Sequence, residues 1–292
     1  MGLDRTILFG LATNRGWERL VRSLPAGERW ARRAAARYVA GDTAADVLEL
    51  ARSLGARGVL TSVDFFGELV QDDATADRVA EEYVRLAEDL NSTPAGTWLA
   101  VDLSHLGLDV DQVGCAERLA AIARRLPRGR RIQVGAEDHD RADQVLECVL
   151  SVAGQGLADR IGATLQANLL RSANDLNRLV EGQVHVRLVK GAYVEPPARA
   201  LPYGEPTDVA FVHLAHRLAE ADAYFALATH DGVLREALLA ALGPRPVEQL
   251  HGVRPEALDA LVARGVPTRV YAPYGADWFR YWMRRLAESR GA

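Results

Sequence analysis

The 292-residue sequence holds only two cysteines, one lysine and no run of about 18 apolar residues. Cys115 and Cys148 both fall in segments with helical spacing, so we expect no disulfide framework and a reducing compartment. The first 16 residues carry an acid at Asp4 and lack an apolar core followed by a cleavage site, so they do not resemble a secretory signal. We therefore predict a cytoplasmic protein without stable membrane insertion, whose contact with a membrane, if any, is peripheral.

The sequence also has no long run of residues of one charge. The net charge is −4, with acidic and basic residues interspersed, and this excludes a basic stripe for nucleic acid or a polybasic membrane patch. Arginine replaces lysine nearly everywhere, which makes Lys190 conspicuous. Either chance left this lysine, or the position needs a compact ammonium group rather than a planar guanidinium.

What the chain does contain is a regular alternation of short apolar runs with stretches of 3.6-residue periodicity. The runs cover residues 58–64, 97–103, 131–135, 160–165, 184–189, 223–228, 246–250 and 267–272. Eight such units predict parallel strands joined by helices, and their total length fits an α/β fold of the (β/α)8, or TIM-like, barrel class. A doubly wound open sheet is the rival, but no GxGxxG follows the first strand.

The N-terminal segment, residues 1–57, is predicted to form a helical arm before a barrel over residues 58–292, with a single domain overall. Its second helix has Asp42 or Thr43 as the expected N-cap and Gly55 as the expected C-cap. In barrels of this class, sites form at the C-terminal ends of the strands. The polar or site-facing residues expected there are Asp64, Asp102, His105, Glu137, Asp138, Gln166, Asn168, Arg187, Lys190, Tyr193, Thr229, His230, Asp231, Leu250, His251, Tyr271 and Tyr274.

The last helix places four polar side chains at spacings of three, four and seven, which puts Tyr281, Arg284, Arg285 and Glu288 on roughly one face. Two adjacent arginines offer bidentate forks for a carboxylate. The plainer interpretation is an exposed amphipathic helix in which Arg284 pairs with Glu288.

Six collinear motifs then carry a resemblance. They read "DLSHLGLD", "LQANLLR", "VRLVKGAYVEP", "ATHD", "QLHGVRPE" and "YAPYGADWFRYWMRRLAE". Together, from about residue 35 to the end, the chain resembles the proline dehydrogenase family in its compact bacterial form. The resemblance implies a distorted (β/α)8 barrel with FAD at the strand ends and the last helix laid over them. It also implies oxidation of L-proline to Δ1-pyrroline-5-carboxylate by hydride transfer to flavin N5, with a quinone as electron acceptor.

The resemblance also assigns cofactor contacts. It places Arg187 near flavin N5, Lys190 at the phosphates or ribityl hydroxyls, and Gln166 in a hydrogen bond to the flavin. The other implied cofactor residues are Gly191 and Ala192 beside the ring, Thr229 and His230 at the dinucleotide, Thr207 at the helix facing the pyrophosphate or adenosine, and Glu288. The structural alternatives are a strand-end surface charge for Arg187, a polar core residue for Gln166, an ordinary turn at Gly191, a satisfied core histidine for His230 and plain helix capping by Thr207.

For the substrate, the resemblance implies that Arg284 and Arg285 clamp a carboxylate while Tyr193, Tyr271 and Tyr281 form aromatic walls, with Leu250 as an apolar contact. Each tyrosine could instead serve packing alone. No dedicated base is expected, because an amine delivered neutral needs mainly hydride geometry and a desolvated pocket.

Two positions depart from the family pattern. A lysine normally ends the second strand and an aspartate the third, whereas this chain has Asp102 and Gly135. Three readings follow: a proline dehydrogenase that tolerates the swap, a relative acting on a different amine that uses space left by Gly135, or a protein with weak or no activity. A fourth hypothesis, from another class, is a metal-dependent barrel hydrolase using Asp64, Asp102, His105, Glu137, His230 and Asp231.

Overall fold

The computed structural model describes residues 31–276 and 278–289, and its centre is a closed barrel of eight parallel strands in sequential order. The strands are β1 (Leu60–Phe65), β2 (Trp98–Val101), β3 (Ile132–Val134), β4 (Ile161–Gln166), β5 (His185–Val189), β6 (Phe225–Ala228), β7 (Val247–Leu250) and β8 (Thr268–Tyr274). Ser62 pairs with Trp98 on one side and Tyr271 on the other, which closes the ring. All eight predicted strands and the barrel class are confirmed.

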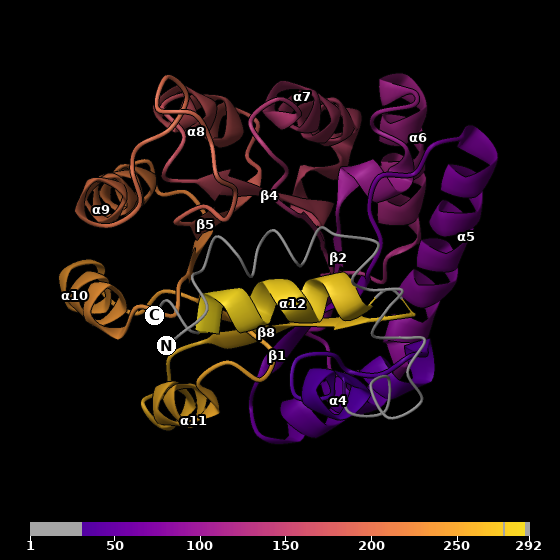
Figure 1. Cartoon of the computed structure of the whole chain (residues 1–292), viewed down its shortest axis with the longest axis horizontal. Helices are drawn as coiled ribbons and strands as arrows, with labels where there is room; N and C mark the ends of the chain where they lie inside the picture. The colour runs from indigo at the N-terminus through magenta and orange to yellow at the C-terminus, as the bar shows by residue number, and fades with distance from the viewer. Residues whose placement is uncertain (1–30, 277, 290–292) are drawn as a thin grey trace.

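Helices surround the strands (Figure 1). They are α4 (Ala44–Ala56), α5 (Asp73–Asp89), α6 (Gln112–Arg125), α7 (Ala142–Val152), α8 (Ser172–Glu181), α9 (Glu205–Glu220), α10 (Gly232–Leu242), α11 (Pro255–Ala263) and α12 (Trp278–Ser289). Four short helices, η1 (Leu90–Ser92), η2 (Leu103–Leu106), η3 (Ala153–Leu157) and η4 (Ala158–Arg160), lie between them. Residues 31–35, in the predicted N-terminal arm, are also helical. The main hydrophobic core lies between the strands and the inner faces of these helices. It contains fully buried strand residues such as Val63, Val134 and Leu188.

The last helix leaves the outer ring. Figure 1 shows α12 running across the barrel beside β8 and β1 rather than standing outside it. Its residues Trp278, Phe279 and Trp282 form a buried cluster with Tyr38, in the segment before α4, and Phe66, which directly follows β1. The predicted placement of the last helix over the strand C-termini is therefore confirmed.

Helix α4 takes the vacated place in the ring. Its Leu54 packs with Val270 of β8 and Leu258 of α11. Thr43, one of the two expected N-caps, is its N-cap, and it forms a capping box with Asp46. The expected C-cap at Gly55 is wrong, because the helix runs to Ala56 and the chain reverses at Gly58, whose φ is +78°.

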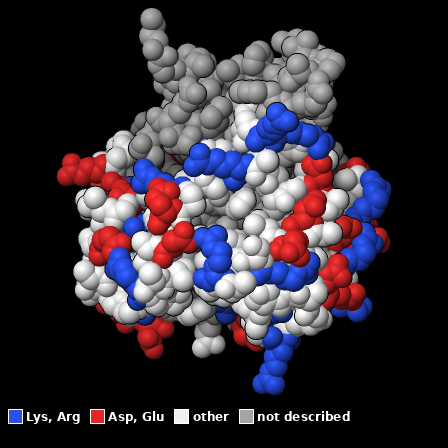
Figure 2. Space-filling view, turned by 90° about the horizontal axis from the view of Figure 1, so that it is seen from below, with Lys and Arg blue, Asp and Glu red and all other residues white. Residues whose placement is uncertain are grey.

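The remaining global features agree with the composition. Cys115 in α6 and Cys148 in α7 are free and buried. On the face seen in Figure 2, acidic and basic side chains are interspersed, without a broad area of either sign. Within the described chain, every helix is too short or too polar to span a bilayer.

Candidate active site

Arg187 of β5 points into the barrel, where it meets Glu248 of β7. Their Nε and Oε2 atoms are 2.6 Å apart, and this contact passes across β6, so both side chains must face the interior. Arg187 is 8% exposed and Glu248 4% exposed. The surface-charge alternative for Arg187 is therefore wrong. Nη2 of Arg187 is buried without a partner in the described chain, which leaves one guanidinium edge available to a ligand.

Glu248 was not anticipated by sequence reasoning. It lies in the run "PVEQL", where an acid is usually read as a solvent-facing residue. Its Oε1 also lies 3.8 Å from Nε of Arg269, another buried arginine. The sequence did hold a signal for this contact, because one acid and two arginines lie inside three of the predicted barrel strands. Charges buried inside a barrel need partners, so these three side chains could have been expected to meet.

Asp64, at the end of β1, is buried between two tyrosines. The hydroxyl of Tyr83 donates to it at 2.8 Å, and Tyr271 of β8 donates to its other oxygen. Burial raises the pKa of Asp64 to about 6, against the lowering effect of these hydrogen bonds and of Arg187. Tyr271, which was predicted to form part of the aromatic wall, therefore lies at the strand ends, and its hydroxyl group is bound to Asp64. No role in a flavin site was predicted for Asp64 from the sequence.

Asp102 directly follows β2, and Gly135 directly follows β3. A Cβ atom at position 135 would overlap the Asp102 carboxylate oxygen and lie 3.1 Å from Asp102 Cγ. The expectation that Gly135 leaves open space for a larger ligand group is therefore wrong, because the Asp102 carboxylate fills that space. The two departures from the family pattern are one local arrangement.

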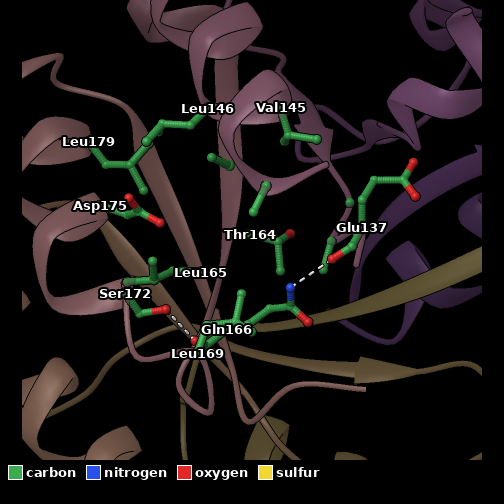
Figure 3. A pocket seen from close by; sticks show the side chains of 14 residues that line it. Glu137, Val145, Leu146, Thr164, Leu165, Gln166, Leu169, Ser172, Asp175 and Leu179 are labelled. Carbon is green, nitrogen blue, oxygen red and sulfur yellow. Dashed lines mark hydrogen bonds between the residues drawn. The ribbon is translucent and has the colours of Figure 1, made fainter. Parts of the chain in front are cut away.

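Gln166, the last residue of β4, is buried and donates from Nε2 to the Glu137 carbonyl at 2.8 Å (Figure 3). Its own carbonyl accepts from the Ser172 hydroxyl, so the strand end is fixed from two sides. The cavity whose lining side chains are drawn in Figure 3 lies beside it, holds about 40 Å³ and is lined in part by residues of α7 and α8. Its size suits a water molecule rather than a cofactor.

Lys190 lies one residue beyond β5 and binds two carboxylates. Its Nζ is 2.6 Å from Asp208 and 2.8 Å from Asp231. Burial lowers the pKa of Lys190, but the two acids outweigh it and the net shift is upward. Gly191 follows with a φ of +118°, and a Cβ there would overlap the side-chain amide of Asn168.

His230, just after β6, is held in one tautomer. The Leu250 amide donates to its Nε2 at 3.2 Å, so the ring proton is on Nδ1, which is buried without a partner in the described residues. Burial, with the positive charges of Arg285 and Arg254, lowers the pKa of His230 to about 4. His230 is therefore not a core histidine with both ring nitrogens hydrogen-bonded, because Nδ1 has no acceptor among the described residues.

The neighbouring cofactor candidates have local roles. Thr229 accepts from the Asp231 amide at 3.1 Å, which shapes the turn after β6. Thr207 does not cap α9, whose N-cap is Gly204; its hydroxyl instead donates to the Pro202 carbonyl at 2.8 Å. Ala192 is exposed.

Helix α12 brings Tyr281 and Arg285 to the same end of the barrel. The Tyr281 ring lies 6.0 Å from the Tyr271 ring, and the Arg285 guanidinium lies 5.0 Å from the centre of the Tyr281 ring. These two contacts place Arg285 on the same side as Tyr271 of β8, where its charge also lowers the pKa of His230. The side chains of Arg284 and Glu288 lie outside the described residues.

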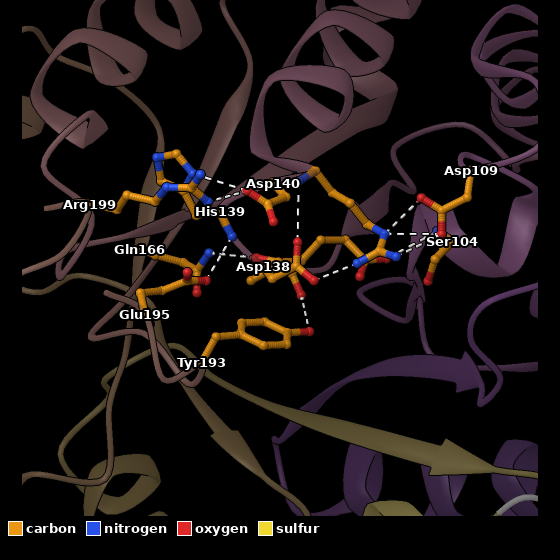
Figure 4. A network of polar contacts seen from close by, with 12 residues as sticks. Ser104, Asp109, Asp138, His139, Asp140, Gln166, Tyr193, Glu195 and Arg199 are labelled. Atoms are coloured by element: carbon orange, nitrogen blue, oxygen red, sulfur yellow. Dashed lines mark hydrogen bonds and ion pairs between the residues drawn. The ribbon is translucent and has the colours of Figure 1, made fainter. Parts of the chain in front are cut away.

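The loop after β5 is fastened over the loop after β3 (Figure 4). Tyr193 donates to the Ala136 carbonyl at 3.0 Å, Glu195 accepts from the His139 amide at 2.8 Å, and Arg199 pairs with Asp140. The loop after β3 is also tied to the loop after β2, because Arg141 pairs with Asp109 at 2.8 Å as well as with Asp138 of its own loop. Tyr193 thus stands at the edge of the site with its ring half-buried.

The metal hypothesis finds no support in the part of the chain that the structure describes, where no three His, Cys, Asp or Glu side chains are grouped to hold an ion.

Comparison with known proteins points to a different class of enzyme. The model of the proline dehydrogenase family matches residues 47–292. Proline dehydrogenase of Deinococcus radiodurans is 31% identical over 266 residues, covering 87% of this chain and 86% of that protein. Proline dehydrogenase 1 of Bacillus subtilis strain 168 is 32% identical over 262 residues, covering 87% and 86%.

Solved structures give the same fold. Proline utilization A from Bdellovibrio bacteriovorus, inactivated by N-propargylglycine, superposes with a TM-score of 0.82 at 19% identity, covering 97% of this chain. A mutant of proline utilization A from Bradyrhizobium japonicum gives 0.77 at 24% identity, covering 94%. The chain spans only 36% and 33% of those longer proteins. The matched motifs, the barrel with its last helix across the mouth and the extent of the sequence match together show that the chain belongs to the proline dehydrogenase family.

Proposed function

We propose that this family member is a FAD-dependent dehydrogenase that oxidises a carboxylate-bearing amine, L-proline or a close relative, at a carbon next to nitrogen. The observation that carries the proposal is the pair of cationic groups facing one end of the barrel. Arg187 is buried with an unpartnered Nη2 atom in the described chain, and Arg285 reaches the same end from α12. The family relationship supplies the reaction class, an oxidoreductase acting on a CH–NH bond.

The buried polar atoms here fit a flavin dinucleotide, which supplies a hydride acceptor when bound. Two donors, Nη2 of Arg187 and Nδ1 of His230, are buried without a partner among the described residues, and Oδ1 of Asn168 is a buried acceptor in the same condition. An acceptor-rich ring and ribityl chain with hydroxyl groups would satisfy both kinds of atom. We propose that Gln166 and the backbone at Gly191 also contact the flavin.

The contacts of Lys190 limit which part of the cofactor it could bind. Its ammonium group already binds Asp208 and Asp231, so a phosphate there would have to compete with two carboxylates. Hydrogen bonding to ribityl hydroxyl groups needs no such displacement. We therefore favour the ribityl chain over the phosphates as the partner of Lys190.

The protein's own contribution to the reaction is orientation and exclusion of water. A substrate carboxylate would bind the guanidinium groups of α12, since Arg presents a rigid bidentate fork. Tyr271 and Tyr281 form an aromatic wall whose rings lie 6.0 Å apart. Such a wall removes water from the reacting carbon, and positioning of this kind can supply much of the rate enhancement. A flavin bound there would accept the hydride that the neutral amine loses from carbon, and the iminium left behind would release its N–H proton to give the imine.

A quinone is the proposed electron acceptor, and the proposed location is the cytoplasm, where any contact with a membrane would be peripheral.

The test is spectroscopic. We expect the purified protein to be yellow with about one FAD per chain, and its absorbance to bleach when L-proline is added without oxygen. Arg285→Met should raise the half-saturating concentration of L-proline but leave that of pyrrolidine, which has no carboxylate, nearly unchanged. Arg85→Met is the matched control, because Arg85 makes only an exposed pair with Glu82. A colourless protein with stoichiometric zinc would refute the proposal.

A further inference from the structure

Asp64 lies behind the aromatic wall of the site. It is at the end of β1 and is 2% exposed, and the hydroxyl groups of Tyr271 and Tyr83 bind its two carboxyl oxygens, that of Tyr83 at 2.8 Å. Tyr271 is itself half-buried, with its ring 6.0 Å from the ring of Tyr281. One hydroxyl group therefore joins a buried carboxyl group to the space that the wall lines.

The hydrogen bonds around Asp64 suit both of its charge states. When the carboxyl group is ionised, each of its oxygens accepts from one tyrosine hydroxyl. When it is protonated, it can donate to the oxygen of Tyr83, because the Tyr83 hydroxyl has a second acceptor in the Phe65 carbonyl at 3.0 Å. A proton can therefore enter or leave Asp64 without leaving a buried donor unpaired.

Titratable groups from several neighbouring elements surround this carboxyl group. Burial raises the pKa of Asp64 to about 6, whereas the hydrogen bonds from Tyr271 and Tyr83 and the positive charge of Arg187 lower it. The other groups around the two tyrosines are Tyr274 of β8, Asp102 after β2, His105 of η2 and Tyr281 of α12, and Glu248 pairs with Arg187. The balance leaves Asp64 able to exchange a proton near neutral pH.

The proposed reaction requires a proton to move before hydride does. A free secondary amino acid carries an ammonium group near neutral pH, and the carbon beside that group cannot give up hydride until the nitrogen loses a proton. Removal of water, with the positive charges of Arg187 and Arg285, favours the neutral amine over the ammonium form in the site. The proton then needs an acceptor close to the bound substrate.

We propose that Asp64 acts through Tyr271 as the acceptor of the ammonium proton of the substrate. This inference rests on the proposed function. The ammonium N–H bond breaks and its proton passes to the hydroxyl oxygen of Tyr271, while the hydroxyl proton of Tyr271 passes to Asp64. One proton leaves the substrate and one reaches the carboxylate, and no electron moves in this step. Asp64 is a positioning residue here, because Tyr271 is the group that meets the substrate.

The experiment measures anaerobic flavin reduction of the holoenzyme by L-proline between pH 5 and pH 9. For the wild type, we expect kcat/KM to rise about tenfold per pH unit below about pH 6, where Asp64 ionises, and to level off above it. In Asp64→Asn, kcat/KM should rise over the whole range, because only substrate that is already neutral in solution reacts, and at pH 7 it should fall by about 10²-fold or more. Asp109→Asn is the control, since Asp109 is an acid in a nearby loop that pairs with Arg141, and this variant should keep the wild-type profile.

Tyr83→Phe tests the same carboxyl group without removing it. The hydrogen bond from Tyr83 lowers the pKa of Asp64, so its loss should move the midpoint of the pH profile to higher pH. Infrared difference spectroscopy gives a readout that does not depend on turnover. On acidification through about pH 6, the band of a protonated carboxyl group should appear in the wild type and be missing from Asp64→Asn.

The outcomes separate the two proposals. A level region that persists in Asp64→Asn, or a midpoint that Tyr83→Phe does not move, would overturn the role of Asp64 and leave the proposed function standing. A protein that holds FAD but is not reduced by L-proline at any pH would overturn the proposed function and this inference with it. FAD content and circular dichroism of each variant show whether it folds, and Tyr83→Phe keeps the test decisive if Asp64→Asn does not.

Discussion

The buried charges of Arg187, Glu248 and Arg269 lead to an asymmetric prediction about stability. Glu248 is the shared acid, with its two oxygens 2.6 Å from Arg187 Nε and 3.8 Å from Arg269 Nε. Glu248→Gln would leave two guanidinium groups buried beside each other. Removing one partner of a buried ion pair costs about 3–5 kcal/mol, and we expect this variant to lose that much.

Arg187→Met should cost less. It leaves Glu248 with Arg269, whose Nη1 is anchored independently by the carbonyls of Thr61 at 2.9 Å and Gly96 at 2.8 Å. Burial lowers the pKa of Arg269 to about 10, and Glu248 opposes that shift, so the remaining pair stays charged at neutral pH. A loss of about 1–2 kcal/mol is expected, within the ordinary range for a point substitution.

The assay is urea denaturation followed by tryptophan fluorescence, with flavin content measured in parallel. The double variant should be more stable than Glu248→Gln alone, because it removes one of the two uncompensated cations. Glu82→Gln is the control, a half-buried partner of the exposed Arg85 whose loss should change stability by less than about 0.5 kcal/mol. If Arg187→Met costs as much as Glu248→Gln, or if the double variant is the least stable, the shared-acid reasoning is wrong.

Three further effects follow from other contacts. Because burial raises the pKa of Asp64 from 3.8 to about 6, its protonated form favours folding: that stability is complete below about pH 4 and is lost as pH rises through 6. Asp64→Asn should flatten the dependence of Tm on pH in that window, and an unchanged slope would contradict the burial argument. Tyr193→Phe removes the 3.0 Å bond to Ala136 and should speed amide hydrogen exchange in residues 191–199 about three- to tenfold; equal rates would show that the bond does not hold the loop. Thr43→Ala removes the α4 capping box with Asp46 and should cost about 1 kcal/mol in urea, whereas Thr43→Ser should restore most of it.

The barrel was predictable because its signal is local. Each strand is a short apolar run between turn residues, and each helix keeps its period, so neighbouring residues suffice to find both. The N-cap at Thr43 is equally local, since a hydroxyl residue three positions before an acid satisfies the first turn. The end of α4 was misplaced because Gly55 precedes Gly58, and the sequence does not say which glycine takes the positive φ.

The site contacts were less accessible because they join distant strands. Glu248 lies 61 residues from Arg187, and the pair forms only when the barrel closes across β6. Whether Gly135 leaves space or receives a side chain depends on the direction of Asp102, which strand prediction does not give. The motifs identified which residues gather at the mouth, but the acids that hold them in position required the coordinates.

The interior triad also explains how Arg187 can serve a ligand while buried. A guanidinium group has several donors in a fixed plane, and Glu248 takes Nε, which fixes the orientation of that plane. Arg269 shares the same acid, so the three charges sum to one positive unit rather than to zero. The Nη2 atom of Arg187 therefore keeps a donor that has no acceptor within the described chain. A neutral group of charges would hold the side chain equally well but would offer less to an electron-rich ring, so we infer that Glu248 positions Arg187 and that Arg269 leaves the three side chains with a net positive charge.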